Sequence, residues 1–265
     1  MSLIFAAAAP RPARSLAARN AWLLAALLPG LALLSWRGEP GLLPRLALAL
    51  SAALLFEALA LRARGKPLRP FLAEGSALAF ACLLVLWMPA LDGWQLLLSI
   101  FIALVLARQL FGGLGANLFH PVMAGVACAQ LLFSVPVTAA RPDPWLATAW
   151  LCGGLLLLAL RITRWQAPLG LVTGALLGLA ATGASPVLLL DPRWFLAAGF
   201  VLTDPVTSSE DARARALGGF ATGAICALAG GQSMAALPFA ILAMNALAPA
   251  LDAWLSPRRA IATRP

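Results

Sequence analysis

Between two long apolar segments, residues 111–121 read FGGLGANLFHP. An acid, Glu74, precedes this stretch, and the pattern of an acid followed by N-x-x-x-P returns in the second half of the chain as Asp204 and residues 245–249. The offset is about 130 residues, close to half of the chain. Because an unpaired charge or amide in a hydrophobic segment costs several kcal/mol, this duplicated pattern predicts a polar site where two repeats of a membrane protein meet.

The composition of the chain is that of an integral membrane protein. Of its 265 residues, 62% are hydrophobic and 11% are charged, so a soluble domain of this composition would expose large apolar patches. The net charge of +9 does not indicate nucleic-acid binding, because the basic residues separate apolar runs and form no face with interleaved aromatic residues. With one histidine and no C-x-x-C pair, neither a multi-histidine metal site nor a disulfide framework is predicted.

A membrane-spanning helix needs about 20 predominantly apolar residues. Ten candidate segments can be assigned, at residues 18–36, 44–63, 73–90, 94–111, 120–137, 145–161, 167–184, 193–204, 215–231 and 235–255. The eighth is short and ends at Thr203-Asp204-Pro205, where the residue before proline disfavours helical geometry and so predicts a helix end. A short or broken segment of this kind is typical of a transporter site.

The distribution of arginine and lysine tests this arrangement. With the N-terminus in the cytoplasm and the segments alternating in direction, 15 of the 19 basic residues fall on the inner side and 4 on the outer side. We therefore predict an all-α integral membrane protein of about ten transmembrane helices, with both termini in the cytoplasm. Five helices per half is an odd number, so the half at 138–265 should be inverted relative to the half at 1–137.

The glycine-rich stretch carries the densest set of polar groups. Gly112, Gly113 and Gly115 allow the backbone to approach a ligand or another helix closely. Asn117 and His120 can each donate or accept hydrogen bonds, so the set could hold a planar heterocycle with amide edges. A tight turn packed on a neighbouring helix is the alternative interpretation, and the sequence leaves both open. No strand precedes the glycines, which disfavours a nucleotide-binding loop.

Four acids lie in or beside apolar segments. Glu57 lies in the middle of the second segment, where we expect it to be paired or protonated, and where it could relay protons. Asp204 could lie at a helix break facing a polar cavity, although an aspartate beside a proline is also an ordinary turn residue. Glu74 and Asp252 fit either a buried site or a boundary position among lipid headgroups.

At these segments the chain resembles the NqrB/RnfD family, the membrane subunits of the sodium-pumping NADH:quinone reductase and of the Rnf ferredoxin:NAD oxidoreductase. The resemblance runs from about Ser15 to Arg259 and is closer to RnfD. It is carried by ARQLFGGLG at 107–115, Asn117, PVMAG at 121–125, LTDPVT at 202–207, and FAILAMN at 239–245 with Pro249 and Asp252. The family implies ten transmembrane helices in two inverted repeats and redox-driven ion pumping across the bacterial cytoplasmic (inner) membrane.

The resemblance also implies flavin cofactors. Family members hold FMN, linked through its phosphate to a threonine of a Ser-x-Ala-Thr motif in the outer loop after the fifth helix. They also hold a non-covalent riboflavin near the glycine-rich turn, bound by the asparagines of an N-x-x-N-P motif. By this resemblance, the residues of this chain that would bind riboflavin are Gly112, Gly113, Gly115, Asn117 and His120.

The chain departs from the family pattern at two places. The loop after the fifth segment is reduced to about Thr138–Pro144, and Ser-x-Ala-Thr is absent from the sequence, so we expect no covalent FMN. Thr138 is a poor substitute because the surrounding motif is missing. At the second place, His120 stands where the family usually has the second asparagine, while Asn117 is kept. An imidazole can still form a hydrogen bond with a flavin edge, with a different pattern of donors.

The resemblance gives the acids a role. Glu74, Asp204 and Asp252 match positions that are candidates for the path of the ion, either Na⁺ or H⁺. The expected function is that of a membrane subunit of an Rnf-type complex, not an enzyme alone, in which other membrane and peripheral subunits carry the ferredoxin and NAD(H) chemistry. Two alternatives are a flavin-free channel or carrier for a small solute or ion, and a scaffold subunit that stabilises its neighbours.

Overall fold

A computed structural model of the chain describes residues 16–113, 115–133, 141–229 and 234–255, and no strand occurs among them. The predicted boundary between the halves, at residues 137 and 138, lies outside this part. The first half contains α1 (Leu16–Trp36), α2 (Leu42–Ala63), α3 (Leu68–Leu72), α4 (Ser76–Trp87), α5 (Gly93–Phe101) with its π-helical continuation η1 (Ile102–Gln109), and α6 (Pro121–Phe133). The second half contains α7 (Pro144–Ala159), α8 (Gln166–Thr182), the short η2 (Pro186–Leu190), α9 (Pro192–Leu196) continuing as η3 (Ala197–Val201), α10 (Ala212–Leu228) and α11 (Ala236–Leu255).

The described residues form the helices of a membrane protein. Each of the ten apolar segments assigned from the sequence contains a helix. The eighth is the short helix α9 with η3, which ends at Val201, before the Asp204-Pro205 pair, so the expected helix end is confirmed. α1, α2 and α11 are long and apolar enough to cross a membrane, and several shorter apolar helices accompany them.

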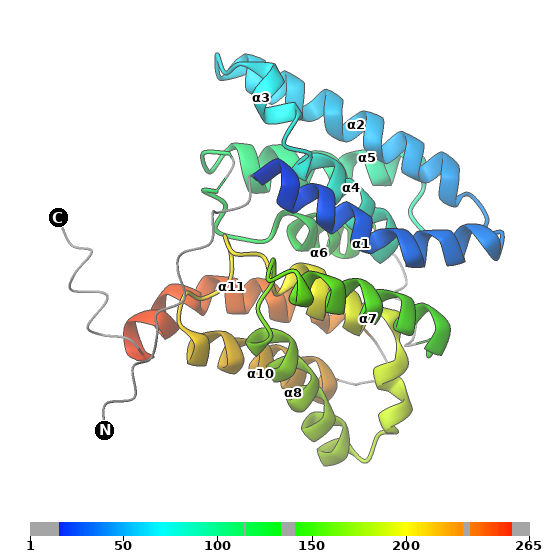
Figure 1. The fold of residues 1–265 in the computed structure, drawn as a ribbon, viewed down its shortest axis with the longest axis vertical. Coiled ribbons are helices and arrows are strands. Elements are labelled where there is room, and N and C mark those ends of the chain that lie inside the picture. The colour runs from blue at the N-terminus through cyan, green and yellow to red at the C-terminus, as the bar shows by residue number, and fades with distance from the viewer. Residues whose placement is uncertain (1–15, 114, 134–140, 230–233, 256–265) are drawn as a thin grey trace, which may run out of the picture.

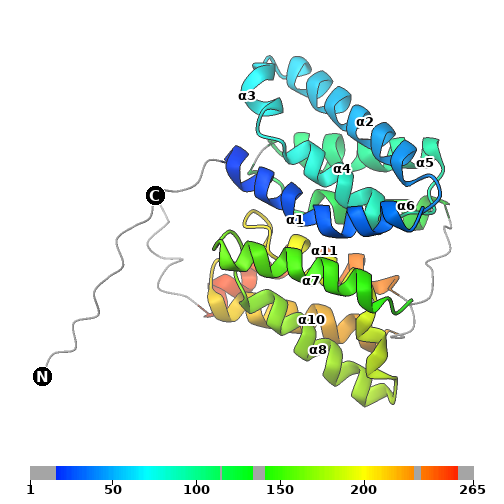
Figure 2. The ribbon, with the colours of Figure 1, turned by 45° about the vertical axis from the view of Figure 1, so that its right-hand side comes forward.

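The helices form two stacked groups. Figures 1 and 2 show α1 to α6 in the upper part of the molecule and α7 to α11 in the lower part. Across the boundary, α1 packs against α7, and α6 packs against α11. The beginning of α1 and the end of α11 lie at the same end of the molecule, on the left in Figure 1. We call this the terminal end, and the functional groups described below lie at it.

Glycines bring α8 and α10 into backbone contact. A Cβ added to Gly174 of α8 would lie 2.0 Å from the carbonyl oxygen of Phe220, and one added to Gly223 of α10 would lie 2.2 Å from that of Leu171. Gly170, Gly174 and Gly178 occupy one face of α8 at four-residue spacing. Small residues at this spacing let helices in a membrane pack closely, where apolar burial alone does not distinguish a helix from lipid.

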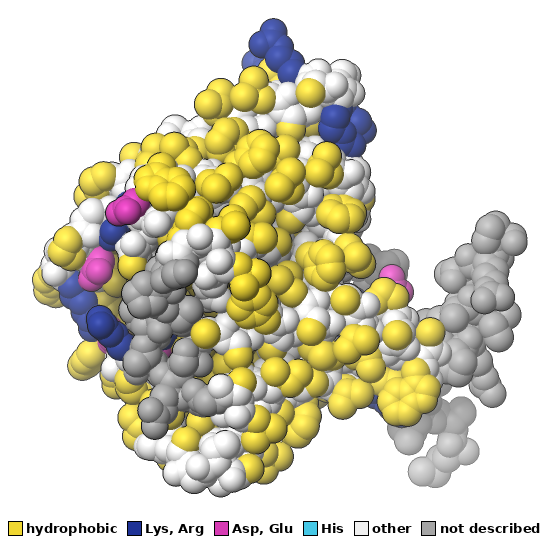
Figure 3. All heavy atoms as spheres, turned by 180° about the vertical axis from the view of Figure 1, so that it is seen from behind, with side chains coloured by type: hydrophobic (Ala, Val, Ile, Leu, Met, Phe, Trp, Pro, Cys, Tyr) yellow, Lys and Arg dark blue, Asp and Glu magenta, His cyan; other side chains and the backbone are white. Residues whose placement is uncertain are grey.

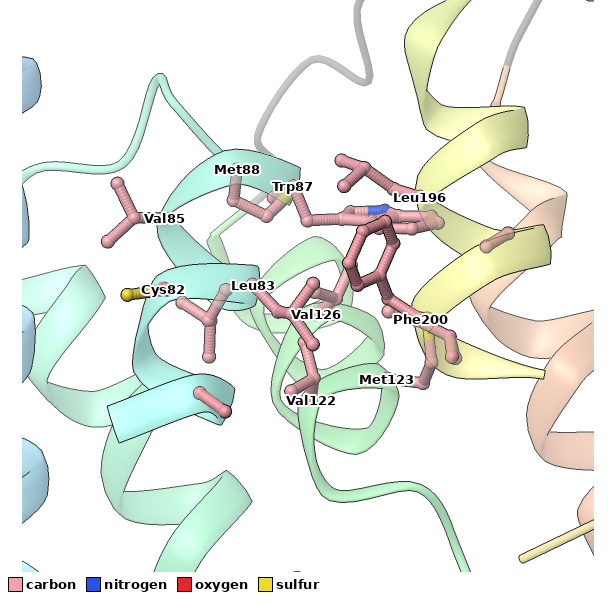
Figure 4. Close-up of a cluster of buried hydrophobic side chains, with 14 of the residues drawn as sticks. Cys82, Leu83, Val85, Trp87, Met88, Val122, Met123, Val126, Leu196 and Phe200 are labelled. Atoms are coloured by element: carbon pink, nitrogen blue, oxygen red, sulfur yellow. The ribbon is translucent and has the colours of Figure 1, made fainter. Parts of the chain in front are cut away.

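Buried apolar side chains fill the boundary between the two groups. In Figure 4, Trp87 of α4 extends toward Leu196 of α9 and Phe200 of η3, with Val126 of α6 close by. Trp87, Leu196 and Phe200 are each at most 3% exposed. Trp150 of α7 meets the edge of Phe200, with ring centroids 6.4 Å apart. This cluster joins α4 and α6 of the first half to α7, α9 and η3 of the second.

The outer surface is largely apolar. Figure 3 shows hydrophobic side chains over most of one face, with charged side chains near its edges. Many large apolar residues are exposed, including Leu28, Leu55, Leu131, Leu155 and Leu177. In water such a surface would aggregate, whereas in a bilayer it is the expected lipid-facing surface.

The duplicated sequence pattern does not correspond to equivalent positions in the two halves. Glu74 precedes α4, whereas Asp204 follows η3. Asn117 lies in the turn before α6, whereas Asn245 lies inside α11. In the second half, Asp191 precedes α9 as Glu74 precedes α4 in the first. The two motifs therefore lie at different places relative to the helices of their halves. The motifs nevertheless meet in space, because both lie at the terminal end.

Candidate functional site

Three charged side chains meet inside the first half of the molecule. Arg108 of η1 lies 3.3 Å from Glu57 of α2 and 3.5 Å from Glu74, measured between guanidinium nitrogen and carboxylate oxygen. The side chains of Arg108 and Glu57 are 1% exposed and that of Glu74 is 7% exposed. Ions buried this completely require partners, because an uncompensated buried charge is strongly destabilising. The expectation that Glu57 is paired is therefore confirmed.

Neutral side chains complete this buried charge cluster. Arg108 donates a hydrogen bond to Ser76 Oγ at 2.6 Å, and Gln109 donates to Glu57 Oε1 at 2.8 Å. Asn20 of α1 donates to Glu74 Oε1 at 2.9 Å. The other carboxylate oxygen of Glu74, Oε2, is buried with no hydrogen bond and faces Arg108 only as an ion pair. The cluster therefore ties α1, α2, α4 and η1 together through polar contacts.

Gly112 and Gly113, two of the glycines predicted to bind a ligand, form a turn that contacts Arg64. Arg64 donates to the side chain of Gln109 and to the carbonyl oxygen of Gly112. Gly112 and Gly113 have φ angles of 123° and 89°, in the region that favours glycine. A Cβ on Gly113 would lie 2.5 Å from Arg64 Nη1. These contacts agree with the tight-turn interpretation for Gly112 and Gly113, which extend the buried charge cluster toward the surface.

A hydrogen-bonded clasp joins the two halves. The backbone N–H of His120, before α6, donates to Asn245 Oδ1 at 3.0 Å. Asn245 Nδ2 in turn donates to the carbonyl oxygen of Thr207 at 3.1 Å. Both hydrogen-bonding atoms of the Asn245 amide are thus used to hold the 205–209 loop and the start of α6 against α11.

The His120 ring forms no hydrogen bond in this clasp. It is 1% exposed and meets Phe80 edge-on, with ring centroids 5.6 Å apart, while Arg108 lies over the same Phe80 ring at 5.6 Å. Neither ring nitrogen of His120 has a hydrogen-bond partner. Buried polar nitrogens are nearly always hydrogen-bonded to protein or to water. The two ring nitrogens of His120 are therefore an exception to this rule, next to the buried charge cluster.

Asp204 bridges the loop after η3 to the start of α1. Its Oδ1 lies 3.3 Å from Arg19, and its Oδ2 accepts a hydrogen bond from Thr207 at 3.3 Å. The Asp204 side chain is 11% exposed. Because Asn20, the next residue after Arg19, binds Glu74, adjacent residues of α1 hold two of the three predicted ion-path acids.

A cavity of about 570 Å³ lies between the two halves at the terminal end. We call it the interhalf cavity. It is lined by residues 115–118, 205–208 and 210–211, and by Asn245, Ala248, Pro249, Asp252 and Ala253 of α11. The glycine-rich stretch at 111–121 and the second motif, from the 204–208 loop to Pro249, therefore both contribute residues to one cavity. Of the five predicted flavin-binding residues, Gly115 and Asn117 line it, whereas Gly112, Gly113 and His120 do not.

Asp252 holds a loop at the edge of the interhalf cavity. Its Oδ2 accepts a hydrogen bond from the backbone N–H of Glu210 at 2.8 Å, and its Oδ1 accepts one from that of Asp211 at 2.9 Å. Asp211 caps α10 by accepting from the N–H groups of Arg213 and Ala214. Both oxygens of Asp252 therefore hold the loop that leads into α10.

Some residues of the buried charge cluster and of the Asp204 ion pair were not identified from the sequence. Arg108 was counted in the sequence as a cation of the inner side. It lies inside the apolar segment 94–111, and that position could have predicted a buried, paired arginine. Asn20 lies in the first apolar segment, and that position could likewise have predicted a buried, hydrogen-bonded side chain. Arg19 gave no such indication, because an arginine before an apolar segment is ordinary at a membrane boundary.

Apolar helices that enclose buried charged side chains, with a cavity between the two halves, define a membrane protein with a buried polar cluster. The chain belongs to the NQR2, RnfD, RnfE family, whose model matches residues 6–149 and 143–260. Several proteins similar to it are named as the D subunit of an ion-translocating oxidoreductase complex. The protein from Pseudomonas aeruginosa strain LESB58 is 32% identical over 89% of each chain, and that from Cellvibrio japonicus is 29% identical over 88% of this chain and 87% of the relative.

These alignments contain gaps in the present chain. The alignment with the Pseudomonas aeruginosa protein extends over 305 positions, more than the 265 residues of this chain, yet covers 89% of it. The relatives therefore carry segments that this chain lacks. The family model also matches in two parts, which overlap at residues 143–149.

Proposed function

We propose that the chain is a membrane subunit of an Rnf-type complex that couples electron transfer between ferredoxin and NAD(H) to ion movement across the bacterial cytoplasmic membrane. Membership of the NQR2, RnfD, RnfE family supports this, as does the name that the relatives share. The chain would act with other membrane and peripheral subunits, and not as an enzyme alone.

The proposed topology is ten spans in two inverted five-helix repeats, with both termini in the cytoplasm. The contacts between α1 and α7 and between α6 and α11 support it, because these are corresponding helices of the two halves. The positions of Glu74 before α4 and of Asp191 before α9 support it too, because α4 and α9 would be the third span of each half. The terminal end would face the cytoplasm, in agreement with the distribution of basic residues.

The buried charge cluster is the observation that carries the proposed function. Two buried carboxylates, Glu57 and Glu74, share the single guanidinium of Arg108. One negative charge remains, and a proton or a bound Na⁺ would neutralise it. The unpartnered Glu74 Oε2 and the unpartnered His120 ring nitrogens offer atoms for such a species. We infer an ion path that begins at Asp204, held by Arg19, and continues to Glu74, held by Asn20. Asp252 would serve it indirectly, by holding the loop.

Asp204→Asn is expected to remove most of the redox-driven ion uptake while leaving assembly of the complex largely intact. The carboxylate would lose its charge, and Arg19 would lose its ion-pair partner, at the proposed start of the path. The measurement is ion uptake per electron transferred in membrane vesicles. Asp143→Asn is the matched control, because Asp143 pairs with Arg37 at the opposite end of α1. A normal ratio of ion uptake to electron transfer in Asp204→Asn would show that this residue is not on the ion path. Ion uptake by the unchanged protein without an electron donor would favour the alternative function, a flavin-free channel or carrier.

The interhalf cavity suits a neutral flavin better than a phosphorylated one. Its volume lies in the range of small-molecule sites. Asn117 lines it and uses only its Nδ2, in a long 3.4 Å contact with Phe119, so its carbonyl oxygen is available to a flavin N–H. The lining includes Glu210, Asp211 and Asp252 but no arginine or lysine, which disfavours a phosphate. A bound riboflavin would supply an electron-carrying group, and the protein would hold it between the halves.

Covalent FMN is proposed to be absent from this chain. The only threonine in the shortened loop, Thr138, lies outside the described residues and lacks the surrounding motif. The gaps in the alignments and the break of the family match near residue 143 support the loss of the segment that carries the FMN threonine in the family.

Asn117→Leu is expected to abolish flavin retention while the subunit stays in its complex. Leucine has a similar size but cannot accept the flavin N–H. The measurement is extraction of the purified complex with mass analysis, separating free riboflavin from flavin that remains attached to the chain. Gln130→Leu is the control, since it changes a half-buried amide of α6 that does not line the cavity. Unchanged riboflavin content in Asn117→Leu would reject the cavity as its site, and flavin attached to the chain would refute the proposed absence of FMN.

A further inference from the structure

Three arginines converge at the terminal end of the second half. Arg161 and Arg164 lie in the connection between α7 and α8, and both are exposed. Neither forms an ion pair with a carboxylate among the described residues. Arg215, in the first turn of α10, is 8% exposed, and its Nη1 donates to the carbonyl oxygens of Ser209 and Glu210. Its Nε is buried without a partner.

These arginines line one cavity. The cavity has a volume of about 540 Å³, and its polar lining residues are Arg161, Thr163, Arg164, Gln166 and Arg215. We call it the arginine cavity, and no acidic residue lines it. Thr163 Oγ1 and Gln166 Oε1 are also buried without hydrogen-bond partners. A threonine hydroxyl and three guanidinium groups are the donors that recognise phosphate oxygens.

Arg161 occupies a backbone position that favours glycine. Its φ angle is 55°, and it is the only residue other than glycine with a positive φ in the described part of the chain. It closes the C-terminal turn of α7, where the left-handed conformation costs a side chain about 1 kcal/mol. A glycine would satisfy the turn at lower cost, so the arginine side chain at this position is consistent with a function of its own.

An apolar groove continues from the arginine cavity. It also encloses about 540 Å³ and shares Trp165 and Gln166 with that cavity. It runs between α8 and α10, past Leu169 and Gly170 on one side and Leu217 and Phe220 on the other. Trp165, Leu169 and Leu217 are 59%, 52% and 39% exposed, so the groove opens on the outer surface. An exposed tryptophan at the junction is typical of the interface between headgroups and acyl chains.

We propose that this junction binds one anionic phospholipid, with its phosphate in the arginine cavity and an acyl chain in the groove between α8 and α10. A cationic pocket joined to a lipid-facing apolar groove has the dimensions and chemistry of both parts of such a molecule. Free phosphate would occupy only the arginine cavity. The assignment rests on the proposed topology in one respect, since it places the lipid in the anionic cytoplasmic leaflet. The lipid would brace the α7–α8 connection against α10.

The test is native mass spectrometry of the purified complex titrated with phosphatidylglycerol or phosphatidylcholine. We expect preferential retention of phosphatidylglycerol, and we expect Arg161→Gln with Arg164→Gln to weaken it about tenfold. Arg62→Gln with Arg69→Gln is the matched control, because these exposed arginines lie at the end of α2 and in α3, outside the cavity. Leu169→Asn with Leu217→Asn should weaken lipid binding without changing competition by inorganic phosphate.

The outcomes are distinguishable. Equal retention of the two lipids, or equal losses in both arginine pairs, would overturn the proposal. Competition by inorganic phosphate that matches the lipid in affinity would indicate a site for free phosphate instead. Redox-driven ion uptake is measured on the same samples. A complex that pumps normally but shows no lipid preference contradicts the lipid site alone, and a complex that retains the lipid but never pumps contradicts the proposed function alone.

Discussion

Replacing Arg108 with methionine is expected to destabilise the protein by about 3–5 kcal/mol and to abolish redox-driven ion uptake. The substitution leaves Glu57 and Glu74 buried with no cation within ion-pair distance. It also removes the donor to Ser76 and the cation over Phe80. Removing one partner of a buried ion pair is far more damaging than replacing both, because the remaining charge is left buried without an opposite charge. The measurement is thermal unfolding in detergent, with uptake assayed in vesicles.

A second substitution separates charge from packing in this prediction. Glu57→Gln in the Arg108→Met background should recover part of the stability, since it removes one of the uncompensated carboxylates while keeping the acceptor for Gln109. Arg62→Met is the control for loss of an exposed arginine at the same end of α2. If Arg108→Met unfolds at the temperature of the unchanged protein, the buried charge cluster does not hold the first half together, and the proposed ion path loses its central cation.

Gly174→Ala should lower the free energy of unfolding by about 1–3 kcal/mol, although it adds a single methyl group. The new Cβ would lie 2.0 Å from the carbonyl oxygen of Phe220 and 2.8 Å from its carbonyl carbon. Both are backbone atoms, which cannot rotate away, so α8 and α10 must separate. Separation would loosen the other close contacts along the same interface, at Gly170 and Gly223.

Gly218→Ala supplies the matched control for this packing prediction. It makes the same chemical change in α10, but its Cβ would meet only Met244 Cε, at 3.8 Å. We expect it to be neutral or slightly stabilising, because alanine favours helix over glycine. The two variants are compared by thermal unfolding in the same detergent. Equal stability of the two would mean that the α8–α10 interface is looser than the structure indicates.

Much of the fold follows from local sequence properties. Apolar segments of sufficient length had to become helices, because only helices satisfy their own backbone hydrogen bonds away from water. The short eighth helix was predictable from Pro205, which restricts the backbone of Asp204. That Glu57 would be paired or protonated was predictable from its position in the middle of an apolar segment, because an isolated charge is costly there. None of these inferences required knowledge of a residue distant in the chain.

The candidate site was only partly predictable, for a physical reason. The sequence identified Asn117, Asp204 and the glycine turn as candidates. It could not show that the Asn245 side chain is hydrogen-bonded to both His120 and Thr207, and so joins the start of α6 to the loop after η3. It also paired two similar motifs by their offset along the chain, which does not record where a residue lies relative to a helix. Glu74 precedes α4 and Asp191 precedes α9, whereas Asp204 follows η3.

By itself the sequence determined that this is a helical membrane protein, which segments form helices, and which polar residues lie within them. These properties depend on the transfer free energy of each segment and on local backbone geometry. Only the tertiary structure decided that Arg108 serves both Glu57 and Glu74, that Asp252 holds a loop, and that Gly115 and Asn117 line a cavity that His120 does not reach. Those facts depend on the direction in which each helix presents its side chains to neighbours that are distant in the sequence.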